Sequence, residues 1–487
     1  MSILESVSNP LVHATDDSAA IAELATAFAV QKKAFAADRN PTIEQRRDRL
    51  MALIGMMMAN RERIGDALAS DFGAHPRPAA DLIEVLGVVG RAQYVLEHLE
   101  QWMASSARET DAVLHGTAQA FVHYQPKGVI GNIVPWNFPF DLSVGPLTEM
   151  LAAGNRVIIK PSEYTPACGE LLREMVAAAF DPDLVHVALG GLDLAQAFSA
   201  TPWDHLLYTG SPNVGRQVMQ AAAANLTPVT LELGGKCPAI MTPGSVTAAN
   251  VESIIGTKII KNGQMCISVD YALVPRGDVD AFVDQATAFM AQAAPDYARG
   301  DEVTGIISAR HLGRLTDMLE EARERQCTIV TLEQDGSVDA TSRRMPMSLV
   351  IDPAPELRIM QEEIFGPILP IVPYDDLDAA LEAINDGERP LGLYVFGDDE
   401  ALTRDVIDRT HSGGACINTC AMQGALPSLG FGGSGMSGMG RHHGIEGFRE
   451  FSNQRGVVIR GEGDLISAFY SPYAKAAGLV QAVLAGG

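Results

Sequence analysis

The spacing of apolar residues changes along the chain and divides it into two predicted parts. From residue 18 to about 106, apolar positions recur with the period of a helix, as in 43–58 and 82–102. From Val129 onward, short apolar runs alternate with segments of helical length. Strands that alternate with helices predict a parallel sheet with helices on its faces. The pattern therefore indicates a helical N-terminal part followed by an α/β fold.

The α/β part contains two series of predicted elements. The strands of the first series are expected at Val129–Val134, Arg156–Lys160, Val185–Leu189, Leu206–Tyr208 and Val229–Leu233. Its helices are expected at Phe140–Ala153, Ala167–Ala179, Leu192–Ala200 and Asn213–Ala224, with Gly154 ending the first of them. The second series starts near Pro238, and its helices are expected at Ala248–Lys261, Val279–Ala294, Ala309–Arg325, Asp376–Ile384 and Asp399–Arg409. Its strands are expected at Tyr271–Val274, Thr328–Leu332, Leu369–Val372 and Leu391–Phe396, and the regular part is expected to end at the glycine-rich segment 430–440.

Composition narrows the class of protein. A chain of 487 residues exceeds the size at which one hydrophobic core usually stops growing, so two or more domains are expected. The formal net charge of −24 argues against a nucleic-acid partner, because phosphate binding needs clustered Lys and Arg. Six cysteines in so long a chain predict no disulfide framework, and Cys416 and Cys420 are interpreted as structural. His442 and His443 lack a ligand-spaced companion, so we interpret them as a solvated or hydrogen-bonded pair and predict no metal site.

The ends of the chain carry no visible targeting signal. Residues 1–5 show no basic stretch before an apolar core, which predicts that there is no secretory signal. No window approaches 18 uninterrupted apolar residues, which predicts that there is no membrane span, and a cytoplasmic location is expected. The mildly apolar tail after Asp464 is expected to dock on a neighbouring surface, with an extended interface or a frayed end as alternatives.

Two glycine patterns compete as phosphate sites. Gly433–Gly438 spells the dinucleotide-binding fingerprint, but no predicted strand precedes it, so we interpret it as a flexible turn. Thr209–Arg216 follows a predicted strand and opens a helix, whose N-terminus favours phosphate. Arg216 and Gln217 stand where a P-loop needs Lys and Ser or Thr, which argues against nucleoside triphosphate hydrolysis. An ordinary α/β connection is the alternative for this turn.

A second candidate for ligand binding is Lys160-Pro161-Ser162-Glu163. It ends a predicted strand, at the edge where open parallel sheets bind ligands. Lys160 can donate to ribose or phosphate oxygens, and Glu163 can accept from ribose hydroxyls. The alternative is an exposed Lys and Glu at a common strand-to-helix turn.

The most informative stretch for chemistry is Lys258–Ser268, which places one cysteine just past an apolar, helix-like run. Cys266 lies there between small and polar residues, where a thiol can reach a cleft. Only the thiolate is a strong nucleophile, and free cysteine has a pKa of about 8.5, so a nucleophilic role needs a site that raises the thiolate fraction. A small buried hydrophobic residue is the alternative interpretation of Cys266.

Further segments complete a constellation around this cysteine. They are Pro-Trp-Asn-Phe-Pro-Phe at 135–140, Leu-Glu-Leu-Gly-Gly-Lys at 231–236 and Glu-Glu-Ile-Phe-Gly-Pro at 362–367. With the Cys266 stretch, Lys160–Glu163 and Thr209–Ser211, in this order along the chain, they resemble the aldehyde dehydrogenase superfamily over about Val129 to Gly456. Gly-Gln-Met-Cys-Ile at 263–267 and the ending 431–444 resemble the class 3 branch, which includes coniferyl aldehyde dehydrogenases.

The sequence departs from the family pattern in two places. Met265 and Ile267 flank the cysteine where the family often has a second Cys or a Thr, and segment 423–430 lacks the Leu-Pro-Phe-Gly-Gly form usual for class 3. Both places would lie near a substrate tunnel. The narrower substrate class is therefore left open.

The resemblance implies NAD(P)-dependent oxidation of an aldehyde to its acid by three catalytic residues. Cys266 would add to the carbonyl, and Asn137 with the Cys266 backbone N–H would stabilise the oxyanion. Loss of hydride to the nicotinamide would leave a thioester. Glu232 would act as general base for the Cys266 thiol or for the water that hydrolyses the thioester. A structural Glu in the strand Leu-Glu-Leu is the alternative for Glu232.

The resemblance also implies a set of residues that bind NAD. Those residues are Trp136, Lys160, Glu163, Gly210, Ser211, Gly215, Leu233, Glu363 and Phe365. Glu163 at the adenosine ribose should repel a 2′-phosphate, so we expect a preference for NAD, although class 3 relatives use NADP as well.

The fold class that the resemblance implies is α/β, with two Rossmann-like parallel-sheet domains plus a small β oligomerisation extension. The expected boundaries are 1–108 and 126–235 for the NAD-binding domain, 236–415 for the catalytic domain, 109–125 and 416–460 for oligomerisation or bridging segments, and 461–487 for the C-terminal tail. The extension would pair residues near Thr110–Tyr124 with residues near Gly456–Arg460. Such an extension makes an intersubunit sheet, so a homodimer is the expected assembly.

The expected substrate is a hydrophobic, aromatic aldehyde such as coniferaldehyde. A general medium-chain fatty aldehyde dehydrogenase is one alternative. A CoA-acylating dehydrogenase is another, and Glu232 argues against it, because acyl transfer to a thiol needs no base for water. A rival of a different class is a thiol esterase or a cofactor-binding protein without redox turnover.

Overall fold

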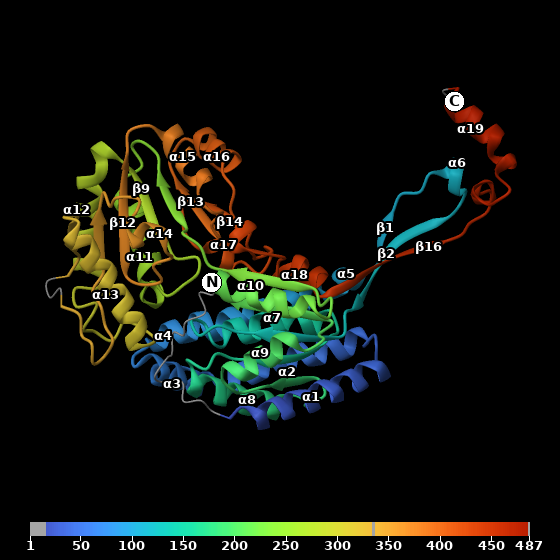
Figure 1. The fold of residues 1–487 in the computed structure, drawn as a ribbon, viewed down its shortest axis with the longest axis horizontal. Coiled ribbons are helices and arrows are strands. Elements are labelled where there is room, and N and C mark those ends of the chain that lie inside the picture. Colours follow the sequence, from blue (N-terminus) through green and yellow to red (C-terminus); the bar gives the residue numbers. More distant parts are fainter. Residues whose placement is uncertain (1–15, 334–336, 486–487) are drawn as a thin grey trace, which may run out of the picture.

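Three sheets organise the described residues, 16–333 and 337–485, of this computed structural model (Figure 1). A six-stranded sheet of order β15-β7-β6-β3-β4-β5 forms the first lobe, and a seven-stranded sheet of order β10-β11-β12-β9-β8-β13-β14 forms the second. A three-stranded antiparallel sheet, β1-β2-β16, forms an arm that projects from the lobes (Figure 1). The α/β fold class is confirmed. The prediction that residues 1–5 carry no secretory signal falls outside the described residues.

The first lobe follows the predicted α/β series closely. Its strands are β3 (Val129–Ile133), β4 (Arg156–Lys160), β5 (Val185–Val187), β6 (His205–Gly210), β7 (Val229–Leu233) and β15 (Gly438–Met439). The first five are parallel, and β15 lies antiparallel beside β7. The helices of the series are α7 (Asp141–Ala152), α8 (Pro166–Ala179), α9 (Leu192–Ala200) and α10 (Pro212–Ala223). Gly154 has φ +93°, as the expected end of α7 requires.

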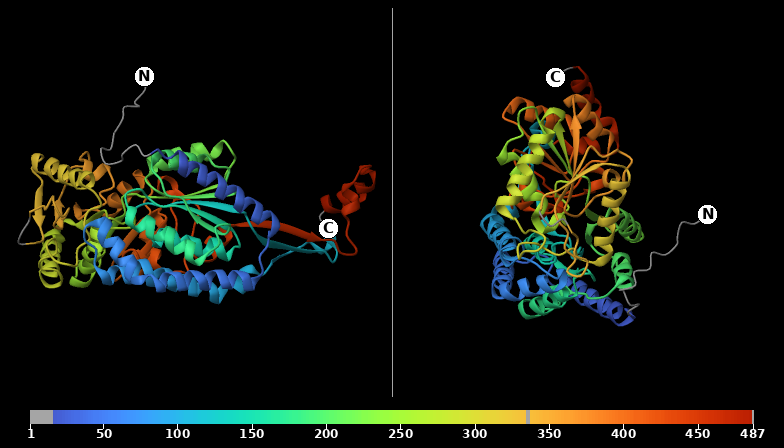
Figure 2. Two further views of the ribbon diagram at one scale, coloured as in Figure 1. Left: turned by 90° about the horizontal axis from the view of Figure 1, so that it is seen from below. Right: turned by 90° about the vertical axis from the view of Figure 1, so that its left-hand side faces the viewer.

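Helices from the N-terminal part cover this lobe (Figure 2). They are α1 (Ser18–Ala37), α2 (Ile43–Ala59), α3 (Arg61–Phe72), α4 (Arg77–Ala79), a π-helical stretch (Ala80–Gly87) and α5 (Val88–Met103). A capping box between Thr42 and Gln45 begins α2. The apolar faces of α2 and α5 are buried with α7 in one hydrophobic core, as the helical spacing of this part predicted.

The second lobe holds the second predicted series. Its strands are β8 (Pro238–Met241), β9 (Tyr271–Pro275), β10 (Thr328–Thr331), β11 (Ser348–Ile351), β12 (Ile368–Tyr374), β13 (Gly392–Phe396) and β14 (Gly414–Ile417). All pairs in this sheet are parallel except β10 with β11. Its helices are α11 (Ala248–Ile259), α12 (Val279–Ala293), α13 (Ala309–Glu324), α14 (Arg358–Gln361), α15 (Leu377–Asp386), α16 (Glu400–Arg409) and α17 (Met422–Ala425).

The arm consists of segments that are distant in the sequence. Its elements are β1 (Ser106–Arg108), α6 (Ala112–His115), β2 (Gln119–Pro126) and β16 (Ser452–Ile459). Strand β16 runs antiparallel to β2, with Gly456 opposite Val122 and Val458 opposite Ala120. This register confirms the predicted pairing of the two segments.

The C-terminal tail lies at the tip of the arm (Figures 1 and 2). It forms two 3₁₀ turns (Ile466–Phe469 and Tyr473–Ala476) and helix α19 (Ala477–Leu484). The Leu465 N–H donates to the Leu114 carbonyl at 2.9 Å, which ties the start of the tail to the arm. No residue of α19 is buried, and its docking on a neighbouring surface stays a prediction. Within residues 16–333 and 337–485, no helix has the length and apolar character that crossing a membrane requires.

The glycine-rich segment 430–440 differs from its prediction. It does not end the regular structure, because α18 (Gly444–Glu450) and β16 follow it. Nor is Gly433–Gly438 a flexible turn, because a capping box between Ser434 and Ser437 closes a 3₁₀ turn there, and Gly438 pairs with Glu232 of β7. Its glycines allow close backbone contact, since a Cβ at Gly438 would collide with the carbonyl of Leu231.

Candidate active site

The loop that carries Cys266 begins with a left-handed turn. Helix α11 ends at Ile259, two residues before the predicted end, because Lys261 and Asn262 have φ +49° and +57°. Such angles are uncommon for residues other than glycine and require support from the surrounding structure. Gly263 continues the turn with φ +75°, and a Cβ there would collide with the backbone of Gly366.

Side-chain hydrogen bonds to the segment 304–307 hold this turn. The Asn262 amide donates to the Thr304 carbonyl at 3.1 Å, and the Gln264 amide donates to the Gly305 carbonyl at 3.0 Å. The Ile307 N–H donates back to Gln264 Oε1 at 3.0 Å. The backbone before Cys266 is therefore fixed by the second lobe.

Cys266 is half-buried and free, and its surroundings favour the neutral thiol. Burial raises the pKa of the Cys266 thiol well above its ordinary value, and the carboxyls of Glu232 and Glu363 raise it further. The neighbouring Cys237 thiol donates to the Cys266 carbonyl at 3.5 Å. A base must therefore remove the proton before this sulfur can act as a nucleophile.

Asn137 lies in the loop between β3 and α7. It is buried, yet its side-chain amide makes no hydrogen bond to the described part of the chain. The loop leads into α7, whose first N–H groups, those of Phe140 and Asp141, donate to Glu84 Oε2 at 3.0 and 2.9 Å. Glu84 thus fixes the loop and leaves the Asn137 amide available as a donor to a ligand.

A buried ion pair joins the Asn137 loop to the Cys266 loop. Lys261 Nζ lies 2.6 Å from Glu84 Oε1, and both side chains are almost fully buried. The ammonium also lies 4.8 Å and 4.5 Å from the ring centroids of Phe72 and Phe138. Sequence reasoning missed this Lys261–Glu84 pair, and the available signal was a lysine inside the apolar run before Cys266.

Glu232 is enclosed near the carboxyl end of β7. Only 1% of the residue is exposed, and neither carboxyl oxygen has a hydrogen-bond partner among the described residues. Burial raises the pKa of Glu232 well above its ordinary value, and Arg441 opposes this effect. The His442 ring lies beside this carboxyl, with Nε2 3.7 Å from Glu232 Oε2.

The structure contradicts the prediction that His442 and His443 form a solvated or hydrogen-bonded pair. Both are buried, so they are not a solvated pair. His442 makes no ring hydrogen bond within residues 16–333 and 337–485, and Nδ1 of His443 makes none either. The rings pack instead on Phe431, whose centroid lies 5.5 Å from that of His442 and 5.4 Å from that of His443. Apolar packing therefore replaces the expected hydrogen bonds.

The N-terminus of α10 has the features of an anion site. Ser211 caps the helix and accepts from the Val214 N–H at 3.4 Å, and Gly210 precedes it at the end of β6. A Cβ at Gly215 would lie 2.8 Å from the side chain of Leu233, so this glycine lets α10 approach the end of β7. The structure thus brings together four of the residues predicted to bind NAD, Gly210, Ser211, Gly215 and Leu233.

Lys160 and Glu163 form an ion pair at the end of β4. Lys160 Nζ lies 3.3 Å from Glu163 Oε2 and also donates to the Pro161 carbonyl at 3.2 Å. The Lys160 side chain is buried, whereas that of Glu163 is about one-third exposed at 35%. Glu163 therefore presents a negative charge to solvent beside a fixed ammonium.

The remaining predicted NAD residues meet where the lobes face each other. The ring of Trp136 in the first lobe packs edge-on against that of Phe365 in the second, with centroids 5.2 Å apart. Glu363 lies so close to Gly234 that a Cβ there would collide with its carboxyl. Burial, with Asp270 nearby, raises the pKa of Glu363 to about 8, which keeps much of it neutral near pH 7.

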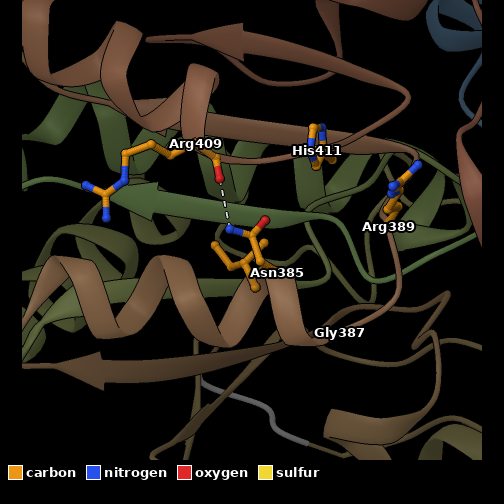
Figure 3. Close-up of a pocket in the computed structure, with 6 residues that line it drawn as sticks. Asn385, Gly387, Arg389, Arg409 and His411 are labelled. Carbon is orange, nitrogen blue, oxygen red and sulfur yellow. Dashed lines mark hydrogen bonds between the residues drawn. The ribbon is translucent and has the colours of Figure 1, made fainter.

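A cavity of about 320 Å³ lies outside this region (Figure 3). Ile384, Asn385, Gly387, Arg389, Arg409 and His411 line it, and the Asn385 amide donates to the Arg409 carbonyl at 2.8 Å (Figure 3). None of these residues belongs to the predicted site. In the described ranges, no three His, Cys, Asp or Glu side chains gather in a way that could hold a metal ion.

The fold and the arrangement of these segments agree with comparisons to known proteins. The aldehyde dehydrogenase family model matches residues 7–457. The chain belongs to the aldehyde dehydrogenase family, as the resemblance implied.

Among its curated relatives are coniferyl aldehyde dehydrogenases. The chain is 42% identical to a probable coniferyl aldehyde dehydrogenase of Pseudomonas aeruginosa, over 93% of this chain and 94% of the relative. It is 38% identical to the coniferyl aldehyde dehydrogenase of a Pseudomonas species, over 93% and 94% of the two chains. It is 36% identical to aldehyde dehydrogenase family 3 member A2 of Rattus norvegicus, over 88% of this chain and 87% of the relative.

Solved structures show the same fold. The substrate-bound state of Staphylococcus aureus AldH superposes with a TM-score of 0.87 at 31% identity, over 95% of this chain and 99% of that one. A Mycobacterium tuberculosis aldehyde dehydrogenase complexed with NAD⁺ superposes with a TM-score of 0.80 at 28% identity, over 90% of each chain.

Proposed function

We propose that this protein oxidises a hydrophobic aldehyde to its carboxylic acid with NAD. One observation carries the proposal: a half-buried thiol and a buried, unpartnered carboxyl, Cys266 and Glu232, lie close enough that the carboxyl raises the pKa of the thiol. The free amide of Asn137 supplies the third group that the reaction needs. In this proposal Cys266 is the nucleophile, Glu232 the general base and Asn137 an oxyanion donor.

The residues present fit NAD. Ser211, Gly210 and Gly215 at the N-terminus of α10 suit a pyrophosphate, since that end of the helix favours anions. Lys160 and Glu163 would hold the adenosine ribose, Glu363 the nicotinamide ribose, and Trp136, Leu233 and Phe365 the apolar surfaces of the cofactor. When bound, NAD would accept a hydride from the substrate. The similar Mycobacterium tuberculosis aldehyde dehydrogenase, which is complexed with NAD⁺, supports this choice of cofactor.

The first half of the proposed reaction forms the bond between sulfur and carbon. Glu232 would accept the thiol proton, and the Cys266 sulfur would add to the aldehyde carbon while the carbonyl oxygen becomes an oxyanion. The Asn137 amide and the Cys266 backbone N–H would donate to this oxyanion, and each such donor typically contributes about 3–4 kcal/mol in the transition state. A neutral amide is suited to this role because it does not trap the negative charge as a cation would.

The second half hydrolyses the thioester that oxidation leaves on Cys266. Glu232 would accept a proton from water as the water oxygen bonds to the acyl carbon. The carbon–sulfur bond would then break, the acid would leave, and the sulfur would regain a proton from Glu232. Because both halves use the same carboxyl, Glu232 must pass its first proton to solvent before the second half begins.

The substrate that we propose is an aromatic aldehyde such as coniferaldehyde. Met265 and Ile267 flank Cys266 in the sequence, and Phe431 packs on the histidine pair. All three side chains are apolar, which suits an apolar substrate. Relatives at 38–42% identity are named coniferyl aldehyde dehydrogenases. Others are named aldehyde dehydrogenase family 3 member A2.

The proposed assembly is a homodimer in which the arm joins a second copy. Val458 and Ile459 of β16 are exposed in the single chain, which leaves apolar surface on the arm. All six cysteines are free, which agrees with a cytoplasmic location.

NADH absorbance at 340 nm tests the proposed function directly. The purified protein should reduce NAD with aldehydes and without CoA, and it should favour cinnamyl and benzylic aldehydes over aliphatic ones. Reduction that requires CoA would favour an acylating enzyme, and reduction fastest with long aliphatic aldehydes would favour a fatty aldehyde dehydrogenase. No reduction under either condition would contradict the proposal.

A further inference from the structure

The carboxyl of Glu232 lacks a fixed hydrogen-bond donor in a place where a base needs one. Both of its oxygens are buried and unpartnered among the described residues. An ionised carboxylate in such surroundings is costly unless a donor or cation faces it. The imidazole of His442 faces it, with Nε2 3.7 Å from Glu232 Oε2.

The fold holds the His442 ring in this place by several contacts. Strand β15 runs antiparallel to β7 with Gly438 opposite Glu232, and Gly440, with φ +81°, lies so close to Thr230 of β7 that a Cβ there would be 2.9 Å from its side chain. The His442 N–H donates to the Phe431 carbonyl at 2.8 Å. The rings of Phe431 and His443 pack edge-on against the His442 ring at 5.5 and 4.8 Å between centroids. The ring therefore has little freedom to turn away from Glu232.

Burial and, to a smaller extent, charged neighbours favour the neutral form of His442. Burial lowers the pKa of its imidazole well below the ordinary value, and Arg91 and Arg441 lower it further. Arg91 on α5 already pairs with Glu149 of α7 at 2.6 Å, and the pKa of the adjacent His443 is also lowered by burial. A neutral imidazole carries one N–H, which it can donate, whereas a second proton would be repelled.

We propose that His442 is a positioning residue for the general base: its Nε2–H donates to the Glu232 carboxylate while that carboxylate accepts the proton of the hydrolytic water. The inference rests on the proposed function, because it assumes that Glu232 is the base. A movement of less than 1 Å along the 3.7 Å separation closes the hydrogen bond. Nδ1 then carries no proton, so His442 orients Glu232 and stabilises its ionised form without relaying a proton.

The proton balance of the step is simple. Water loses one proton to Glu232 as its oxygen bonds to the acyl carbon, and the bond from that carbon to the Cys266 sulfur breaks. Glu232 becomes neutral and its hydrogen bond from His442 weakens. The proton then returns to the Cys266 sulfur, which leaves Glu232 ionised and again paired with His442. The imidazole keeps one proton throughout.

Two substitutions of His442 test separately the effect of its hydrogen-bond donor and the effect of its ring. His442→Phe keeps a flat ring and removes the donor, and His442→Gln keeps an amide donor that does not titrate. The rates of the NADH burst and of thioester hydrolysis are measured from pH 6 to 10 with the full enzyme, NAD and an aldehyde. We expect His442→Phe to slow both the burst and hydrolysis about tenfold at pH 7.5, because both use ionised Glu232, and to move the acidic limb of each about one pH unit upward. His442→Gln should keep a profile close to that of the unaltered protein.

The outcomes are distinguishable. Equal pH profiles for His442→Phe and His442→Gln, or an acidic limb that neither substitution moves, would overturn the proposal. His205→Gln is the control, because His205 is another buried histidine and hydrogen bonds to Thr230 of β7 at 2.8 Å without facing Glu232. It should lower thermal stability and leave the acidic limb in place. Should His442→Phe fail to fold, His442→Leu serves as the donor-free variant. Undiminished hydrolysis in Glu232→Gln would contradict the proposed function itself, whatever the His442 variants do.

Discussion

At the scale of single residues, the proposed nucleophile, Cys266, and the proposed base, Glu232, share one electrostatic environment. Burial raises the pKa of both Cys266 and Glu232 well above their ordinary values, so Cys266 rests as a thiol near neutral pH and Glu232 is ionised to a smaller extent than an ordinary carboxyl. A protonated carboxyl cannot accept the proton of a thiol or of water. Each group therefore becomes competent only as the pH rises through its raised pKa.

The pH dependence of turnover follows from the direction of these two pKa shifts. The rate of NAD reduction with saturating aldehyde should increase from pH 6 to at least pH 9, because the fractions of ionised Glu232 and Cys266 both increase with pH. Steady-state rates in constant-ionic-strength buffers measure this, with thermal denaturation at each pH as the control for unfolding. A rate that peaks below pH 7 would be incompatible with the raised pKa values.

Glu163 supports a second prediction at this scale. Its partly exposed carboxylate should repel a 2′-phosphate, so Glu163→Gln should raise kcat/KM for NADP about tenfold and change that for NAD much less. Glu170→Gln, at an exposed position on α8, is the matched control and should leave the NADP:NAD ratio unchanged. An NADP preference in the unaltered protein would contradict the assignment of Glu163.

At the scale of elements, the bounds of several strands and helices could be predicted because burial and period coincide there. Strands β4 and β7 and helix α9 have the predicted bounds, since each is an apolar or amphipathic run that ends at Gly, Pro or Thr. Strands β8, β11 and β14 were missed. Each has four residues, which is too few to distinguish a strand from a loop by alternation.

The turn before Cys266 shows the limit of local reasoning. The apolar run predicted a helix through Lys261, but Lys261 adopts a left-handed conformation because its ammonium is committed to Glu84, 177 residues away in the sequence. Helix propensity is a weak influence of less than about 1 kcal/mol per residue, and a buried ion pair overrides it. The tertiary contact therefore decides where the helix ends.

This Lys261–Glu84 pair gives the prediction at the scale of elements. Lys261→Met should lower the free energy of unfolding by about 3–5 kcal/mol, because it leaves the Glu84 carboxylate buried without its cation. It should also lower kcat, since the pair joins the loops of Asn137 and Cys266. Chemical denaturation and steady-state kinetics measure the two effects.

The double variant Glu84→Gln, Lys261→Met tests the physical cause. It should recover part of the lost stability, because no unpaired charge is left buried. Arg404→Met, which breaks an exposed pair with Glu400, is the control and should cost less than about 1 kcal/mol. A Lys261→Met variant as stable as this control would show that the pair does not hold the loops.

At the scale of the whole molecule, the site is assembled from segments that no local pattern connects. The six motifs and their order were readable in the sequence, and they gave the family. The contact of His442 with Glu232 was not readable, because it depends on β15 returning to β7 after the second lobe is complete. The packing of Trp136 on Phe365 likewise depends on how the two lobes meet. Sequence order specifies which groups are present, and the fold specifies which of them touch.

The arm supports the prediction about assembly. Val458 is 68% exposed in the single chain, and we expect a second copy to cover it. Val458→Asp together with Ile459→Asp should shift the mass measured by light scattering from a dimer toward a monomer. Leu226→Asp, at a position on the first lobe that is 89% exposed, is the control and should leave the mass unchanged. A monomeric unaltered protein would contradict the proposed dimer.

The covalent state of Cys266 during turnover tests the central claim most directly. Unaltered protein is mixed with an aromatic aldehyde and NAD, quenched with acid within one turnover, digested and analysed by mass spectrometry. The account predicts one acyl group per chain on the peptide that contains Cys266, and no such group when Cys266→Ala protein is treated alike. An unmodified Cys266 peptide after NADH has formed, or sustained aldehyde oxidation by the Cys266→Ala protein, would contradict it.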